Sequence, residues 1–213
     1  MIPQPTPRGQ TPPASPRWQA SLSDLVTDPR ELLAMLGLDA GLLPAAIAAD
    51  RAFRLRVPRE FVARMQPGDP ADPLLRQVLP VGEELAEVDG FHGDPLAEAR
   101  HTREAGLLQK YQGRVLLIVS GACAVNCRYC FRRHFPYDDN TPDTAHWESL
   151  FATLAADSSI EEVILSGGDP LMVSNRRLTW IITRLAAIPH LTRLRIHTRL
   201  PVVVPARVDD ELP

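Results

Sequence analysis

Residues 115 to 130 read Val115-Leu-Leu-Ile-Val-Ser-Gly-Ala-Cys123-Ala-Val-Asn-Cys127-Arg-Tyr-Cys130, an apolar run followed by a loop that holds all three cysteines of the chain. The run from Val115 to Ser120 is short and continuous, which is typical of a strand buried on both faces of a parallel sheet. The cysteines follow directly at C-x3-C-x2-C spacing. The stretch therefore predicts a parallel sheet with a metal-binding loop at the end of a strand.

The cysteine spacing supplies three thiolates and no fourth. A [4Fe-4S] cluster usually takes four cysteines, so a loop with three leaves one iron free to bind a group other than protein. Zinc is an alternative, because His134 follows Cys130 closely enough to complete a Cys3His set, although structural zinc ligands usually come as two separated pairs. Inert or regulatory thiols are a further alternative. A disulfide framework is not favoured, because the cysteine count is odd.

Strands and helices alternate after the cysteine loop. A helix is expected to start at Thr141-Pro142, a strand at Val163 to Leu165, a second helix after the cap Ser174, and a third strand at Leu194 to Thr198. The apolar faces of the two expected helices are formed by Trp147, Leu150, Phe151 and Leu154, and by Leu178, Ile181, Ile182, Leu185 and Ile188. This βαβαβ series predicts the opening half of a (β/α) barrel.

Three polar segments follow the ends of the expected strands: the cysteine loop, Gly167-Gly168-Asp169 and His197 to Arg199. In (β/α) barrels the chemistry lies on the loops at the carboxyl ends of the strands. We therefore expect these segments to converge on one site. Between Arg100 and Pro136 the chain carries seven basic residues and a single acid, Glu104, which favours an anionic ligand there.

The rest of the chain divides in two. Residues 1–16 are rich in proline and are expected to form a disordered tail, and residues 17–107 are expected to be a helical region, with Asp28-Pro29 starting one helix. The barrel portion is then 108–213. No stretch resembles a signal peptide or a membrane span, so a cytoplasmic protein is expected. The net charge of −3 does not favour bulk binding to nucleic acid or membranes.

Residues Gly106 to Tyr137 resemble the radical S-adenosylmethionine (SAM) enzymes of the lysine 2,3-aminomutase family. Within it they are most similar to the branch that makes (R)-β-lysine for elongation factor P. Further segments with the family pattern are Arg17 to Gln19, Arg56 to Pro70, Leu165 to Leu171 and Arg195 to Pro201. The resemblance thus covers nearly the whole chain after residue 16. It implies an α/β fold in which an N-terminal helical region precedes the first half of a partial (β/α)6 barrel.

The resemblance also implies roles for individual residues. Cys123, Cys127 and Cys130 would bind three irons of a [4Fe-4S] cluster, and the fourth iron would bind the amino and carboxylate groups of SAM. Arg132 would hold the carboxylate of lysine. The implied cofactor-binding residues are Tyr129, Ser166, Gly167, Gly168, Asp169, His197 and Arg199, together with Lys110, Tyr111 and Arg114, which correspond in part to the segment that seats pyridoxal phosphate (PLP).

PLP is normally held through a lysine Schiff base. Lys110 is the only lysine of the chain, and the family's Schiff-base lysine lies in a C-terminal part that is absent here. Only about half of the barrel is present by this comparison. We therefore expect the chain to be a truncated form, with an unpaired strand edge.

The implied activity is the conversion of L-lysine to (R)-β-lysine for elongation factor P. The implied partners are an electron donor, elongation factor P and its lysyl ligase. A general lysine 2,3-aminomutase is one alternative, and an inactive iron-sulfur or zinc remnant is another. An RNA-binding module that uses the basic and aromatic residues between Arg128 and Tyr137 is disfavoured, because the chain is not basic overall.

Overall fold

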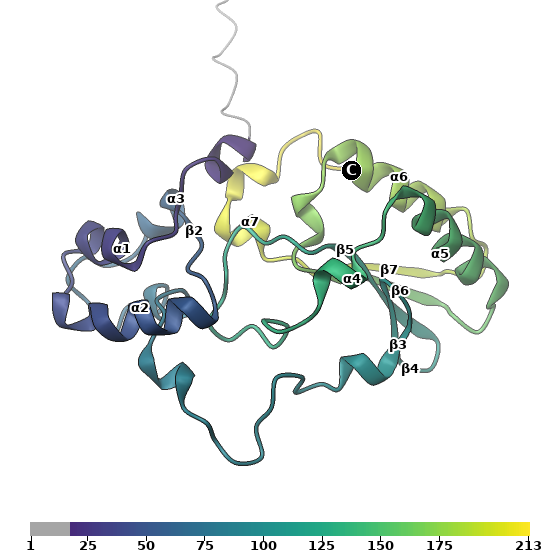
Figure 1. Cartoon of the computed structure of the whole chain (residues 1–213). Helices are drawn as coiled ribbons and strands as arrows, with labels where there is room; N and C mark the ends of the chain where they lie inside the picture. Colours follow the sequence, from purple (N-terminus) through teal and green to yellow (C-terminus); the bar gives the residue numbers. More distant parts are fainter. Residues whose placement is uncertain (1–17) are drawn as a thin grey trace, which may run out of the picture.

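A five-stranded sheet in the order β3-β4-β5-β6-β7 carries the C-terminal half of the chain. The computed structural model describes residues 18–213 (Figure 1), so the expected disordered tail at 1–16 lies outside the described residues. The strands are Thr102–Glu104 (β3), Leu107–Tyr111 (β4), Arg114–Ser120 (β5), Glu162–Gly167 (β6) and Arg193–Ile196 (β7). β5, β6 and β7 are parallel, whereas β3 and β4 are antiparallel additions at the other edge.

Two helices connect the parallel strands. α5 (Thr144–Ala156) joins β5 to β6, and α6 (Asn175–Ala186) joins β6 to β7. They lie side by side above the strands in Figure 1, and Trp180 of α6 packs edge-on against Trp147 and Phe151 of α5, with ring centroids 6.2 and 5.2 Å apart. The alternation of strand and helix confirms the expected α/β class.

The boundaries of these elements differ from the expected ones in three places. The first helix starts at Thr144 rather than at 141–142, because the Asp143 carboxylate caps it by accepting from the His146 N–H. The second helix is capped by Ser174 as predicted, but it ends at Ala186, before Ile188. β7 ends at Ile196, which leaves His197, Thr198 and Arg199 in the loop that leads to α7 (Leu200–Val203).

Residues 17–107, expected to be a helical region, hold helices together with short strands that the sequence did not predict. The region contains α1 (Pro29–Leu36), α2 (Leu43–Ala52) and α3 (Arg59–Val62), with Asp28 capping α1 as predicted. It also holds β1 (Leu25–Val26) paired with β2 (Val57–Pro58), and it ends in β3 and the first residue of β4. β4 pairs with β5 through a tight turn in which Gly113 has a φ of +72°, a conformation that favours glycine.

The remaining elements are short. α4 spans Tyr137–Asn140, and the 3-10 helices are Trp18–Leu22 (η1), Ala40–Leu42 (η2), Leu75–Gln77 (η3), Gly82–Leu85 (η4), Glu98–His101 (η5), Pro170–Met172 (η6) and Pro205–Arg207 (η7).

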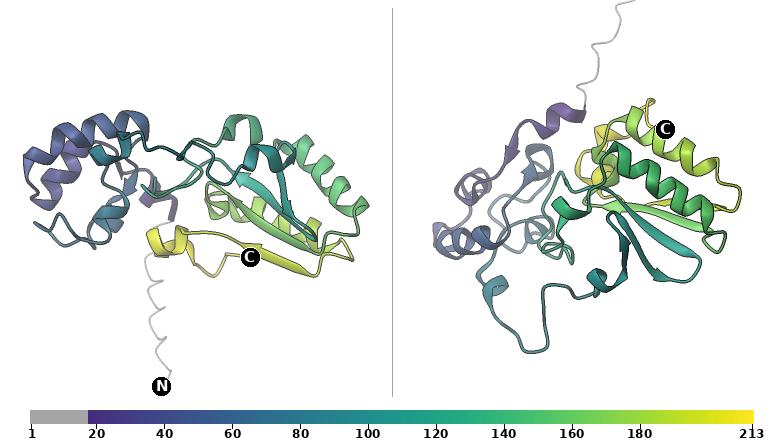
Figure 2. Two further views of the ribbon diagram at one scale, coloured as in Figure 1. Left: turned by 90° about the horizontal axis from the view of Figure 1, so that it is seen from below. Right: turned by 45° about the vertical axis from the view of Figure 1, so that its right-hand side comes forward.

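The two views in Figure 2 show the N-terminal helices as a group beside the sheet, with the cysteine loop between them. Buried side chains from both parts form one hydrophobic cluster, which fixes the sheet against the N-terminal helices. No helix within residues 18–213 is long and apolar enough to cross a bilayer.

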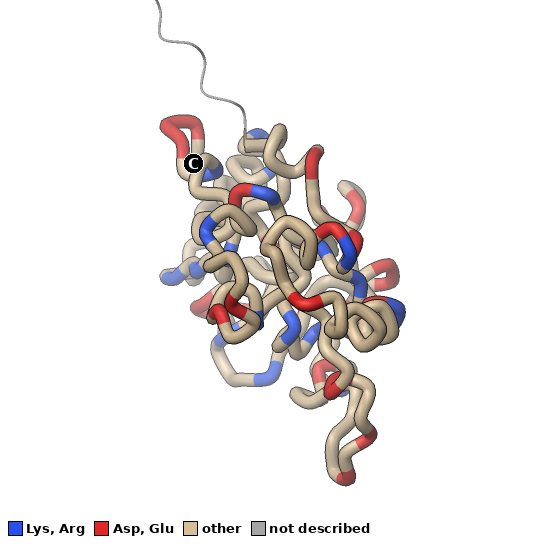
Figure 3. Tube along the Cα trace, turned by 90° about the vertical axis from the view of Figure 1, so that its left-hand side faces the viewer, with Lys and Arg blue, Asp and Glu red and all other residues tan. Residues whose placement is uncertain are grey.

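Charged residues of both signs are interspersed along the trace (Figure 3). The loop that projects at the lower right of Figure 3, between η4 and η5, is an exception, because it carries acidic residues and no Lys or Arg.

Glu162 joins the amino-terminal ends of the three parallel strands. Its carboxylate is almost completely buried and lies 2.9 Å from Arg193 Nη1, 3.0 Å from Arg195 Nε and 2.7 Å from Arg114 Nε. The hydrogen bond from Arg193 lowers the pKa of Glu162 below its ordinary 4.5. Burial opposes this shift, and the charges of Arg114 and Arg195 reinforce it.

Acidification should remove the stability that Glu162 supplies. Because the pKa is lower in the folded protein, this contribution is complete above the ordinary glutamate pKa and is lost as the pH falls through the folded-state value. We expect Glu162→Gln to lower the Tm at pH 7 and the difference from wild type to shrink below about pH 4.3. Melting curves from pH 7 to pH 3 test this, and a difference that stays constant would contradict it.

Candidate functional site

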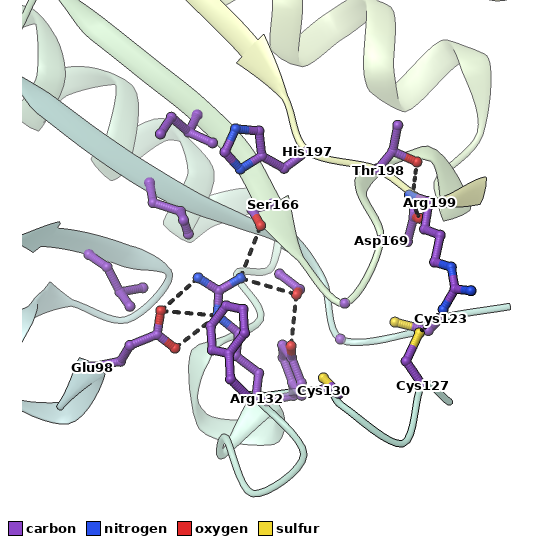
Figure 4. A pocket seen from close by; sticks show the side chains of 18 of the residues that line it. Glu98, Cys123, Cys127, Cys130, Arg132, Ser166, Asp169, His197, Thr198 and Arg199 are labelled. Carbon is purple, nitrogen blue, oxygen red and sulfur yellow. Dashed lines mark hydrogen bonds and ion pairs between the residues drawn. The ribbon is translucent and has the colours of Figure 1, made fainter. Parts of the chain in front are cut away.

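A cavity of about 1040 Å³ extends along the sheet, from the start of β5 to the carboxyl ends of the parallel strands. At the carboxyl ends its walls come from the cysteine loop after β5, from the end of β6 and the Gly167-Gly168-Asp169 loop, and from the end of β7 and the loop that follows it. Figure 4 shows side chains from these segments facing the same space. The expected convergence of the three loops is therefore observed. Lys110 and Tyr111, which were expected to bind a cofactor, also line the cavity, and they lie on β4, a strand that the sequence did not predict.

The cysteine loop is held from outside by the N-terminal region. Arg56 Nε donates to the Cys123 carbonyl at 2.9 Å, and the Asn126 N–H donates to the Arg56 carbonyl at 3.0 Å. Arg128, between the second and third cysteines, donates from its Nη1 to the Phe53 carbonyl at 2.7 Å. These contacts fix the backbone of the loop and leave the three thiols free and partly exposed.

Burial changes the acidity of two of the three thiols, Cys123 and Cys130. Burial raises the pKa of Cys123 to about 12, and the charge of Asp169 adds to the shift. Burial also raises the pKa of Cys130. Because a metal binds the thiolate, loading the loop with a cation would release protons.

The arrangement of the cysteines bears on the choice between zinc and a cluster. Within residues 18–213, no three Cys, His, Asp or Glu side chains converge closely enough to hold a single metal ion. His134 lies outside the cavity, beside Gly93. His134 and the three cysteines are thus not brought together as a Cys3His set in this part of the chain, and thiolates are the ligands that an iron-sulfur cluster takes.

The Gly167-Gly168-Asp169 loop packs against the start of the cysteine loop with no room for a side chain. A Cβ on Gly168 would lie 2.5 Å from the Ala122 carbonyl oxygen, and one on Gly167, whose φ is +116°, would lie 2.5 Å from the Ser120 carbonyl oxygen. The Gly168 N–H donates to Ser120 and the Asp169 N–H donates to the Ala122 carbonyl. Both glycines are needed for this close backbone approach.

The Asp169 carboxylate ties this loop to the segment after β7. It is buried, and it accepts hydrogen bonds from the Leu171 N–H (2.9 Å), the Thr198 hydroxyl (2.7 Å), the Arg199 N–H (2.8 Å) and the Leu200 N–H (2.9 Å). A carboxylate has about four acceptor positions, and these four donors occupy them. In this structure Asp169 thus joins two loops, and the predicted contact with the SAM amino group would have to share these oxygens.

Arg132 lines the cavity and is paired with Glu98, a residue that the sequence analysis did not select. Arg132 Nε and Nη2 donate to the Glu98 carboxylate at 2.8 and 2.7 Å, and Nη1 donates to the Ser166 hydroxyl at 3.0 Å (Figure 4). Both side chains of the pair are buried. Glu98 is aimed inward by an unusual backbone, because Ala97 before it has a φ of +53°. No local signal in the sequence points to this pair.

The other predicted residues differ in their placement. His197 and Arg199 line the cavity, whereas Tyr129 is 64% exposed and does not. Lys110 Nζ donates to the Leu96 carbonyl at 3.2 Å. Tyr111 is exposed at the cavity, and Arg114 also reaches it but is paired with Glu162.

The geometry agrees with what known proteins show. The sequence model described as the Radical SAM superfamily matches residues 117–211, the segment that contains the cysteine loop and both other loops of the cavity. Residues 117–211 belong to the radical SAM superfamily. The chain is similar over almost its whole length to proteins named L-lysine 2,3-aminomutase. The relative from Escherichia coli (strain K12) is 51% identical over 201 residues, which are 94% of this chain and 58% of that protein.

Two further relatives of this chain carry the same name. The protein from Haemophilus influenzae is 48% identical over 91% of this chain and 57% of its own length. The protein from Clostridium subterminale is 35% identical over 76% of this chain and 39% of its own length. The chain thus spans less than three fifths of the length of the relatives that it matches.

Membership in the radical SAM superfamily and these relatives imply a [4Fe-4S] cluster, SAM and PLP as cofactors. The three cysteines fit the cluster, and the adjoining glycine loop leaves the cavity open beside it. Lys110, at the far wall, offers a positive charge that suits a phosphate. The chain holds no second lysine for a Schiff base.

Proposed function

We propose that the protein containing this chain is a radical SAM isomerase that converts L-lysine to (R)-β-lysine. The observation that carries the proposal is the cavity at which the cysteine loop, the Gly167-Gly168-Asp169 loop and Arg132 meet. The similarity to proteins named L-lysine 2,3-aminomutase supports lysine as the substrate. We infer that residues 108–213 form the first units of a partial (β/α)6 barrel and that residues 17–107 form a separate N-terminal region that precedes it.

The groups of residues that line the cavity would have separate roles. Cys123, Cys127 and Cys130 would hold the cluster, and the glycine loop would let SAM approach it closely. When bound, the cluster and SAM supply radical chemistry and PLP carries the amino group. The mostly apolar cavity walls exclude water from the reacting atoms. The electron comes from a separate donor protein.

Two groups that line the cavity would bind the anionic parts of the ligands. The Arg132 guanidinium would bind the lysine carboxylate, since its planar shape suits a carboxylate. Because Glu98 and Ser166 accept from all three of its nitrogens, the lysine carboxylate would have to displace one of these partners. Lys110, Tyr111 and Arg114 would seat the PLP phosphate. Of these three, Lys110 is the best placed, because its Nζ contacts only the Leu96 carbonyl while Arg114 is engaged by Glu162.

Electron paramagnetic resonance of anaerobically reconstituted, dithionite-reduced chain tests the proposal. We expect a [4Fe-4S]⁺ signal that changes when SAM is added, because the fourth iron lacks a protein ligand. A cluster signal that SAM leaves unchanged would contradict the proposal and indicate an iron-sulfur remnant. A zinc-containing sample with no signal would contradict the cluster itself.

We further propose that the product serves the modification of elongation factor P, in the cytoplasm. The support is the segment from Cys127 to Tyr137, which resembles that branch of the family. The competing function is a general lysine 2,3-aminomutase. Transfer of β-lysine to elongation factor P in the presence of its lysyl ligase supports the first function. Release of free β-lysine without such transfer supports the second.

A further inference from the structure

Arg199 reaches across the cavity mouth to the sulfur of a cysteine. Its Nη1 lies 2.6 Å from Cys127 Sγ, although the two residues are 72 positions apart in the sequence. Figure 4 shows the side chain running from the loop after β7 down to Cys127. None of the other cysteines receives a side-chain hydrogen bond among the described residues. The contact therefore singles out one of the three sulfurs.

Three contacts hold Arg199 in this position, one to its backbone and two to its guanidinium. The Arg199 backbone N–H is bound by the Asp169 carboxylate at 2.8 Å, which fixes the start of the side chain. Its Nη2 donates to the Gln77 side-chain carbonyl, and the Gln77 backbone carbonyl accepts from the Arg128 N–H at 2.8 Å, next to Cys127. The Tyr129 ring lies 5.4 Å from the guanidinium carbon. Gln77 thus positions both the donor and the loop that carries the sulfur.

We propose that Arg199 sets the reduction potential of the cluster that the cysteine loop binds. The inference rests on the proposed function, since it requires a cluster on Cys127. One-electron reduction of [4Fe-4S]²⁺ to [4Fe-4S]⁺ adds negative charge, part of which lies on the sulfurs. Hydrogen bonds to the sulfurs and the local net charge set the potential of such clusters. A cationic N–H donor on Cys127 stabilises the reduced state and raises the potential.

A redox titration of the anaerobically reconstituted chain, followed by electron paramagnetic resonance with dithionite as reductant, tests this role. For Arg199→Gln we expect the ratio of reduced to oxidised cluster at a fixed potential to fall about tenfold, which corresponds to a midpoint about 59 mV more negative. Gln77→Ala keeps the positive charge of Arg199 but removes the side chain that holds its guanidinium. The midpoint potential of this variant should therefore also become more negative, by less than that of Arg199→Gln.

Arg184→Gln is the matched control. It removes the same charge from the outer face of α6, where Arg184 is half-exposed and pairs with Glu148, and its midpoint should equal that of wild type. Arg199→Lys is a second variant that tests the role if Arg199→Gln does not fold. A lysine ammonium lacks the two-pronged guanidinium that reaches both Cys127 Sγ and Gln77, so this variant should also have a more negative midpoint potential.

The outcomes separate the two proposals. A wild-type chain that takes up no cluster would overturn the proposed function. A wild-type cluster that responds to SAM, with equal midpoints in wild type and the Arg199 variants, would overturn only the role of Arg199. An equal shift of the midpoint potential in Arg184→Gln would also overturn the role of Arg199. Loss of a positive charge far from the cluster would then change the potential as much as loss of Arg199 does.

Discussion

Replacement of Glu98 with alanine should lower the free energy of unfolding by about 3 to 5 kcal/mol, because it leaves the buried Arg132 guanidinium without its partner. The side chains of Arg132 and Glu98 are only 7% and 12% exposed, so water from the cavity can replace the lost carboxylate only in part. Ser166, the other side-chain acceptor for Arg132, carries no compensating charge. Urea denaturation of the purified chain measures the difference.

An exposed ion pair in the same chain provides the control. Glu148→Ala removes the partner of Arg184, but both side chains are more than two fifths exposed, so the cost should be about 0 to 1 kcal/mol. Replacing both buried charges, as in Glu98→Leu with Arg132→Met, should recover much of the loss, because no unpaired charge remains. If Glu98→Ala costs no more than Glu148→Ala, the pair is not the buried element that the structure shows.

Serine in place of Cys123, Cys127 and Cys130 should reduce the iron bound after reconstitution from about four atoms per chain to fewer than one. The exchange barely changes side-chain size, but it removes the thiolate that binds iron. Serine can still accept from Arg199, the donor that Cys127 Sγ meets, so the melting temperature of the metal-free chain should change little. Iron and sulfide analysis gives the measurement.

His134→Ala distinguishes the cluster from zinc. His134 lies outside the cavity, so this variant should retain its full iron content. If the loop held zinc in a Cys3His site, His134→Ala would instead lose metal, as the cysteine variants do. Loss of metal in His134→Ala, or retention of iron in the triple serine variant, would contradict the assignment of the cysteine loop.

Local signals accounted for several elements correctly. The apolar run after Arg114 is β5, Asp28 and Ser174 cap α1 and α6, and the alternation of apolar runs with helical periodicity marks β6 and β7. These signals lie within a few neighbouring residues, so they need no knowledge of distant contacts. The hairpin between β4 and β5 was missed, because β4 is half exposed and gives only a weak apolar pattern.

The placement of side chains around the cavity was less predictable. Tyr129 follows a family pattern but stands in solvent, and Asp169 is engaged by four donors of the chain itself. A motif specifies which residue types are present. Whether a given side chain is free depends on every donor and acceptor that the fold brings near it.

The α/β class, the loop of three cysteines and the succession of the parallel strands follow from the amino-acid order alone, because they depend on periodicity and spacing along the chain. The contacts of Glu98 with Arg132 and of Arg199 with the sulfur of Cys127 depend on the folded chain, since they join residues 34 and 72 positions apart. Parallel strands end at one edge of the sheet, so residues far apart in sequence meet there and their charges pair through space.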